Sequence, residues 1–284
     1  MLTITYTNSN GTVKMQGGGA SSPLRITEID GLGLTEREYS VAVYANYDGQ
    51  NTFNSRAVAR TITIALELCG KDISAIIRNA INVFSKSGTL RITDEHTDRK
   101  ITCHQVQMPE LSRVLKGQIL NFVIQFVCDS PFFEDAEDSI LPLYQREKLI
   151  SSPFSLPCMF GKITAGANIE IRGGISVEPI ISIYCPQAFE GVENIIVSNE
   201  TTGKVIKLDY APSDNEKIVI DVKNRKITSS KNGNIINYLT EDTFIGDFVL
   251  TPGLNILTVN IGDTTSGFAI ECQYNNLYNE AVII

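Results

Sequence analysis

The chain has 284 residues, with 24 basic and 32 acidic side chains, a formal net charge of −8 and a sequence pI of about 4.9. This length predicts two domains, and 43% hydrophobic against 20% charged residues is typical of a folded chain rather than a disordered one. The acidic balance disfavours nucleic-acid binding, which needs clustered Lys and Arg side chains.

Signals for export and for membrane insertion are missing from the sequence. No apolar run approaches the ~20 residues that a spanning helix needs. The first residues, 1–7, lack the basic and apolar regions of a secretory signal. The cysteines are dispersed without a CxxC pair, which indicates reduced, mostly buried thiols rather than a disulfide framework or a zinc site; they are Cys69, Cys103, Cys128, Cys158, Cys185 and Cys272.

Aromatic residues are concentrated in one segment near the N-terminus, residues 38–53. Residues 38–53 fit a strand, a turn centred on Asp48 and Gly49, and a returning strand. The aromatic side chains in it are those of Tyr39, Tyr44, Tyr47 and Phe53. Aromatic residues with a polar tip favour protein interfaces and also ordinary strands, so the residues alone leave interface and core open.

Periodicity assigns the rest of the first half. Hydrophobic residues alternate with others at 61–68 and at 121–128, which predicts half-buried strands. Between them, apolar residues recur at three- and four-residue steps from Ile73 to Phe84. Asp72 is placed to cap the start and Gly88 lies just beyond the end, so we predict one helix over about 72–86, packed on a sheet.

The middle of the chain differs in character from both halves. Residues 136–160 contain Pro142, Pro153 and Pro157 and show no clean periodicity, which predicts an extended connector. After it, short alternating stretches are separated by Gly-containing turns at roughly 8–12-residue spacing. This pattern predicts a β-sandwich over 161–284.

The candidate chemical groups favour structural explanations. Cys103 and His104 could form a nucleophile pair, but neighbours on a strand point to opposite faces, so we expect Cys103 inside and His104 outside. Residues 94–98 (Asp-Glu-His-Thr-Asp) offer metal ligands, yet their composition fits a polar hairpin turn better.

Catalysis finds little support elsewhere in the sequence. The glycines at 17–19 lack the GK[ST] sequence of a phosphate loop, and the Asp30–Gly33 stretch lacks a third glycine. A pair of carboxylates of the kind glycosidases use stays open, because spacing across sheets is not visible in a sequence. We therefore predict no enzyme, with no catalytic residue, no metal ligand and no cofactor.

The order of short motifs along nearly the whole chain resembles the phage distal tail proteins, the siphovirus-type tail component at the tip of a tail tube. Each motif is degenerate, and their order carries the resemblance. In the first half they are Ile26–Gly33, Asp48-Gly49, Arg56, Arg60–Ile64, Leu68–Gly70 and Phe126–Pro131. In the second half, Thr201–Gly203, Ile218–Asp221 and Thr251–Asn255 are similar to the family's galectin-like C-terminal β-sandwich.

The resemblance implies a mainly β fold with one helix and two domains. These are an N-terminal β-sandwich-like ring domain over 1–135, a linker over 136–160, and the galectin-like sandwich over 161–284. By the same similarity, the 38–56 segment is the arm that reaches the neighbouring protomer. The interface residues predicted on it are Tyr39, Tyr44, Tyr47, Asp48, Gly49, Phe53 and Arg56.

The implied function is structural. Such proteins form a homohexameric ring of the virion tail tip, assembled in the host bacterial cytoplasm. The ring connects the tail tube protein to the tail-associated hub protein, in line with the tape measure, and near receptor-binding proteins. DNA passes through the ring without specific binding, which suits an acidic chain.

The alternative function is a carbohydrate-binding adhesion module that recognises host cell-wall glycans. The galectin-like resemblance and the tract 274–279, rich in Tyr and Asn, favour it. Sugar-binding galectins, however, use a constellation of His, Asn, Arg and Trp, whereas this chain has no Trp and carries both histidines in its first half. Because function lies in the site rather than in the fold, we rank the structural role first.

Overall fold

The structure, a computed structural model, describes residues 1–17, 22–46, 48–69, 72–113, 119–148, 161–186, 194–261 and 268–282. Within these residues the fold is mainly β with one α-helix, as the sequence predicts. The contacts divide the chain into two compact units: unit 1 is Met1–Ala136 together with Leu277–Ile284, and unit 2 is Glu137–Asn276.

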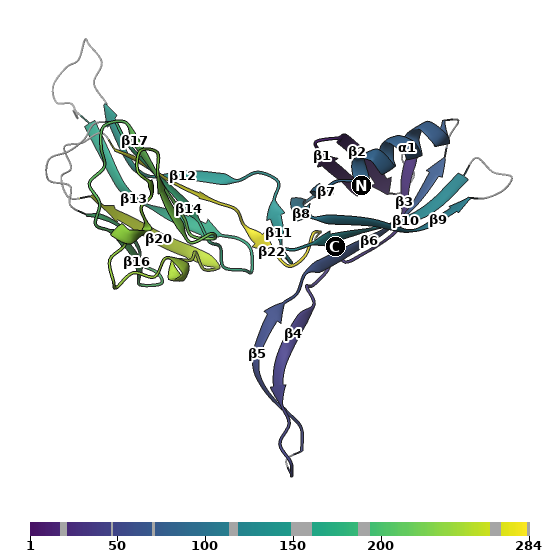
Figure 1. Cartoon of the computed structure of the whole chain (residues 1–284), viewed down its shortest axis with the longest axis horizontal. Helices are drawn as coiled ribbons and strands as arrows, with labels where there is room; N and C mark the ends of the chain where they lie inside the picture. The colour runs from purple at the N-terminus through teal and green to yellow at the C-terminus, as the bar shows by residue number, and fades with distance from the viewer. Residues whose placement is uncertain are drawn as a thin grey trace. The chain divides into compact units, whose positions relative to one another are not determined.

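Unit 1 is built on one ten-stranded sheet with the order β22-β11-β8-β7-β1-β2-β3-β6-β10-β9 (Figure 1). Its neighbours pair antiparallel except for β2 and β3, which run parallel. The strands are β1 Thr3–Asn8, β2 Gly11–Gly17, β3 Leu24–Asp30, β6 Arg60–Cys69, β7 Gly88–Thr93, β8 Asp98–Cys103, β9 Gln105–Arg113, β10 Ile119–Cys128, β11 Phe133–Asp135 and β22 Leu277–Tyr278.

This sheet curls until strands far apart in its order meet. Five strands separate β8 from β10 in the sheet, yet the backbone N–H of His104 donates to the carbonyl of Val127 at 3.0 Å. The Sγ atoms of Cys103 and Cys128 lie 3.1 Å apart in the core. The sandwich-like packing predicted for this domain therefore comes from one folded sheet, and not from two separate ones.

The core of unit 1 follows the predicted alternation. Ile62, Ile64, Leu66 and Leu68 on β6 are all at most 1% exposed, and every second residue of β10 from Phe122 to Cys128 is buried beside them. The two strands pair over their full lengths, so their inward side chains form one continuous apolar surface. Removing such side chains from water is the main stabilising contribution to the sheet.

Helix α1, Ile73–Phe84, covers part of this core (Figure 1). It contacts β1, β2 and β6 and buries Ala80, Val83 and Phe84. Two details differ from the prediction: Asp72 stands at the N-cap but makes no side-chain cap hydrogen bond, and Ile81 is 45% exposed. Gly88 begins β7, where a Cβ atom would lie 2.4 Å from the carbonyl oxygen of Thr7, so close strand approach requires glycine there.

Unit 2 contains a second ten-stranded sheet, with the order β16-β15-β20-β13-β12-β21-β14-β17-β18-β19. Its strands are β12 Ser139–Lys148, β13 Gly161–Ile171, β14 Ile180–Cys185, β15 Ile195–Asn199, β16 Lys204–Leu208, β17 Glu216–Asp221, β18 Lys226–Ser229, β19 Gly233–Asn234, β20 Gly253–Asn260 and β21 Ala269–Tyr274. Two short 3₁₀ turns, η1 Ile236–Tyr238 and η2 Ile245–Asp247, lie between β19 and β20.

Strand β13 changes partner at Gly166. Residues 161–165 pair with β12, whereas residues 166–171 pair with β20. Gly166 has φ +142°, and a Cβ atom there would lie 2.7 Å from the carbonyl oxygen of Leu257. Only glycine fits at this point. Here β13 leaves β12 and continues beside β20.

Two segments differ from the predicted domain limits. Ser139–Lys148, inside the predicted connector 136–160, forms strand β12. The strand accommodates Pro142 by a register shift between Pro142 and Tyr144 opposite β21, because proline cannot donate to the ladder. In addition, Leu277–Tyr278 pairs with β11 of unit 1 and is not part of the C-terminal unit.

Candidate inter-subunit interface

Strands β4, Arg37–Ala42, and β5, Asn51–Ala57, form a two-stranded sheet of their own within unit 1 (Figure 1). We call residues 37–57 the arm. Its large hydrophobic side chains face solvent: Tyr39 is 59% exposed and Phe53 66%. An isolated two-stranded ribbon is at best marginally stable in water, and exposed apolar side chains in a group mark a surface that binds something.

One face of the arm carries its large hydrophobic side chains, with the polar residues Arg37, Thr52 and Ser55 beside them. Tyr39 pairs with Ser55, and Val41 pairs with Thr52, so their side chains leave the ribbon on the same side. The register shifts between Ser40 and Val41, which makes Phe53 the extra residue of a bulge; alternation from Ser55 brings its side chain to this side as well. We define the apolar face of the arm as Tyr39, Val41 and Phe53.

The opposite face of the arm is polar. Glu38 pairs with Arg56, and their side chains form an exposed ion pair with 2.7 Å between Nη2 of Arg56 and Oε2 of Glu38. Ser40 pairs with Asn54 on the same side. An exposed ion pair adds little stability, so this face is suited to water.

The base of the arm is held by one buried arginine. Arg60, 5% exposed, directs its five N–H groups at five acceptors, including the carbonyls of Gly31 at 2.6 Å and Gly33 at 2.8 Å. It also donates to Thr35 Oγ1 at 2.5 Å, and its guanidinium lies 4.6 Å from the ring centroid of Phe133. The polypeptide entering the arm is therefore fixed to the sheet.

The structure brings the predicted interface residues together on one element, with one exception. Tyr39, Tyr44, Phe53 and Arg56 are all exposed, and Asp48 and Gly49 lie in the turn, where Gly49 has φ +98°. Tyr47 lies outside the described residues. The prediction missed Val41 and Val43, which are 45% and 71% exposed. Their alternation with Ser40 and Ala42 was the available signal.

The other predicted candidates have structural roles. Cys103 is buried and His104 exposed, as the strand argument predicts; Nδ1 of His104 lies 2.8 Å from Asp129. In the 94–98 turn, backbone N–H groups of His96 and Thr97 donate to Asp94 and hold the pKa of that carboxyl below its usual value. That carboxylate therefore caps the β7–β8 hairpin.

The Tyr- and Asn-rich tract 274–279, considered for sugar stacking, is likewise used internally. The Oδ1 atom of Asn276 accepts from the backbone N–H of Arg172 at 3.0 Å, and Asn275 donates to Asp138 at 2.6 Å. The ring of Tyr278 lies 3.8 Å from the guanidinium of Arg99. Asn275, Asn276 and Tyr278 therefore make contacts within the protein.

The close pair of thiols allows a chemical test of the curled sheet. Treatment with a diazenedicarboxamide, a two-electron thiol oxidant, is expected to join Cys103 to Cys128; each sulfur loses its proton, and the oxidant is reduced to the hydrazine. Mass spectrometry should find one peptide pair lighter by about 2 Da. The reaction should be slow, because the hydrogen bond to Cys128 and burial raise the pKa of Cys103. Complete alkylation of both cysteines after prolonged oxidation and unfolding would contradict the geometry.

Neither a membrane-spanning helix nor a cluster of metal-binding side chains is found among the described residues. No helix there is long and apolar enough to span a membrane. Within the same ranges, no group of three or more His, Cys, Asp or Glu side chains is arranged to hold a metal ion.

Comparison with known proteins gives matches in both sequence and fold. Residues 173–278 match the family described as siphovirus-type tail component, C-terminal domain. The crystal structure of SPP1 Dit (gp 19.1) superimposes with a TM-score of 0.66 over 98% of this chain and 99% of that chain, at 12% identity. The structure of the phage P2 baseplate in its activated conformation with Ca contains a chain that matches with a TM-score of 0.49 and 12% identity. The match covers 97% of this chain and 97% of that chain.

None of the curated proteins compared with the chain matches its sequence. The family match lies almost wholly in unit 2, whereas the shared fold with SPP1 Dit extends over both units. Together they confirm the resemblance to siphovirus-type distal tail proteins that the order of the motifs predicted.

Proposed function

We propose that the protein is a structural component of a phage tail tip whose copies assemble into a homohexameric ring. The main support for this proposal comes from the arm. The hydrophobic side chains of its apolar face are exposed to solvent in the single chain. A face of this kind is stabilised when a second copy removes it from water. SPP1 Dit, which shares the fold, is described as a paradigm of the hub of the adsorption apparatus in phages that infect Gram-positive bacteria.

The proposed ring has the partners of a tail-tip adaptor. It would connect the tail tube protein to the tail-associated hub protein, with the tape measure and receptor-binding proteins as further neighbours, in a virion assembled in the host bacterial cytoplasm. DNA would pass through it without specific binding, which the net charge of −8 supports. In unit 2, the turning strand β13 is compatible with the galectin-like sandwich that we propose for it.

The ring can be tested through the two faces of the arm. Native mass spectrometry and negative-stain images of the purified chain are expected to show six copies. Replacing Val41 and Phe53 together by Ser should weaken association at least about tenfold, because each large side chain contributes about 1.5–3 kcal/mol on burial.

The matched control changes Ser40 and Asn54 to Ala on the polar face and should leave the ring intact. Circular dichroism establishes that both variants fold. A wild-type chain that stays monomeric at high concentration would refute the ring. Equal assembly of the two double variants would refute the role of the apolar face.

A further inference from the structure

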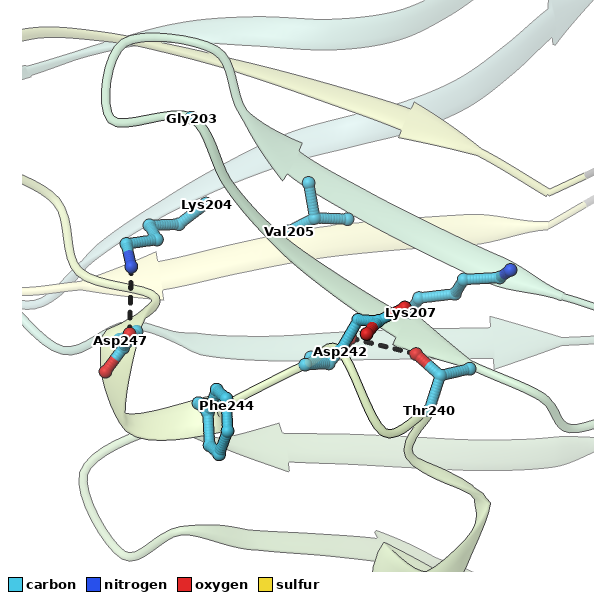
Figure 2. Close-up of a pocket in the computed structure, with 9 residues that line it drawn as sticks. Gly203, Lys204, Val205, Lys207, Thr240, Asp242, Phe244 and Asp247 are labelled. Carbon is cyan, nitrogen blue, oxygen red and sulfur yellow. Dashed lines mark hydrogen bonds and ion pairs between the residues drawn. The ribbon is translucent and has the colours of Figure 1, made fainter.

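A hollow in unit 2 lies between the edge strand β16 and the residues 240–247, with a volume of about 400 Å³ (Figure 2). Val205 and Lys207 line it from the strand, and Asp242, Phe244 and Asp247 line it from the opposite side. Its size is within the range of small-molecule sites, at the lower end.

Phe244 is the unusual residue of this hollow. Its side chain is 71% exposed, although Thr243 and Ile245 on either side are buried. Its carbonyl accepts from the N–H of Asp247 at 3.0 Å, and the N–H of Thr240 donates to the carbonyl of Lys207 at 3.1 Å. The ring is therefore presented to solvent by a hydrogen-bonded backbone.

Charges around Phe244 balance. Nζ of Lys204 lies 2.9 Å from Oδ2 of Asp247, and both side chains are about half exposed (48% and 54%). Lys207 and Asp242 add one charge of each sign (Figure 2). Two ammonium and two carboxylate groups give no net charge, so the hollow favours a neutral polar ligand over an ion.

We propose that this hollow binds a neutral saccharide ring. The apolar C–H face of a pyranose covers the exposed ring of Phe244, and the sugar hydroxyls bond to Lys204, Asp242 and Asp247. An ammonium group has three donors and a carboxylate about four acceptor positions, so the ion pair of Lys204 and Asp247 retains capacity for hydroxyls. The exposed aromatic surface is a single ring, which matches one sugar better than a protein surface.

This inference goes beyond the proposed structural role and uses none of the residues of the arm. Saturation-transfer NMR on the full chain, with glucose, galactose and N-acetylglucosamine as separate probes, is expected to show binding of at least one at millimolar concentration. Phe244→Ala should weaken that binding at least about tenfold. The control Leu254→Ala, at a residue 54% exposed on β20, should not change it.

Two outcomes would overturn the proposal: no saturation transfer from the wild-type chain with any of the three sugars at tens of millimolar, or equal binding by the Phe244 and Leu254 variants. Native mass spectrometry of the same samples reports assembly separately. A ring that binds no sugar would refute this inference alone, and sugar binding by a monomer would refute the ring alone.

Discussion

Arg60→Met is expected to destabilise unit 1 by about 3–5 kcal/mol, since the substitution removes all five donors while their acceptors stay in place. The acceptors that lose a partner include the carbonyls of Pro131 at 2.7 Å and Asn279 at 2.6 Å. Methionine can fill much of the space over Phe133 but cannot donate. Hydrogen-exchange mass spectrometry should show faster exchange in β3, in β6 and at the base of the arm.

The control for this change is Arg25→Met on β3, where the side chain is exposed. Its effect should stay within about 0.5 kcal/mol. Exchange rates in unit 2 give a second internal reference, because the two units need not unfold together. If Arg60→Met exchanged no faster than Arg25→Met, Arg60 would not hold the base of the arm.

Glu216→Gln is expected to destabilise unit 2 by about 2–4 kcal/mol. Glu216 is fully buried and accepts from Tyr210 Oη at 2.5 Å, from the backbone N–H of Ser213 at 2.6 Å and from the hydroxyl of Ser229. The side-chain amide of glutamine has an NH₂ group where one carboxylate oxygen stood. This group donates hydrogen bonds, so it faces at least one of the three donors listed above, and that hydrogen bond is lost. Urea unfolding monitored by exchange in β17 and β18 measures the loss.

The same carboxylate predicts a pH dependence. Burial alone raises the pKa of Glu216, but the hydrogen bonds from Ser229, Tyr210 and Ser213 outweigh it and leave the pKa below its usual value. The stabilisation is therefore complete above the pKa of the unfolded chain and is lost as the pH falls through the lower pKa of the folded one.

Unit 2 of Glu216→Gln should show a flatter stability profile between about pH 3 and pH 6 than the wild type. Glu241→Gln, at an exposed residue of the same unit, should keep the wild-type profile. Parallel profiles for wild type and Glu216→Gln would show that this carboxylate does not carry the dependence.

Local sequence patterns were sufficient to predict structure and burial where these depend on a single helix or strand. The alternation at 61–68 predicted which face of β6 is buried, and the helical spacing after Asp72 predicted α1. The arm was also visible, because aromatic residues and the Asp48-Gly49 turn lie within one short segment.

Contacts between distant residues were not predictable in this way. Nothing local to Arg60 shows that it is buried or that Asn279 is among its acceptors. The proline-rich stretch hid β12, because a register shift next to Pro142 is set by the partner strand. The hollow around Phe244 likewise depends on residues 203–207 and 240–247 meeting across a strand edge.

The return of the chain to unit 1 has a consequence for biosynthesis. β22 pairs with β11, and the N–H of Ala281 donates to the carbonyl of Leu32 at 2.9 Å, so the first unit receives its last strand only after all of unit 2 has left the ribosome. Until this segment has been synthesised, Arg60 lacks the carbonyl of Asn279 among its acceptors, so the base of the arm is incompletely held.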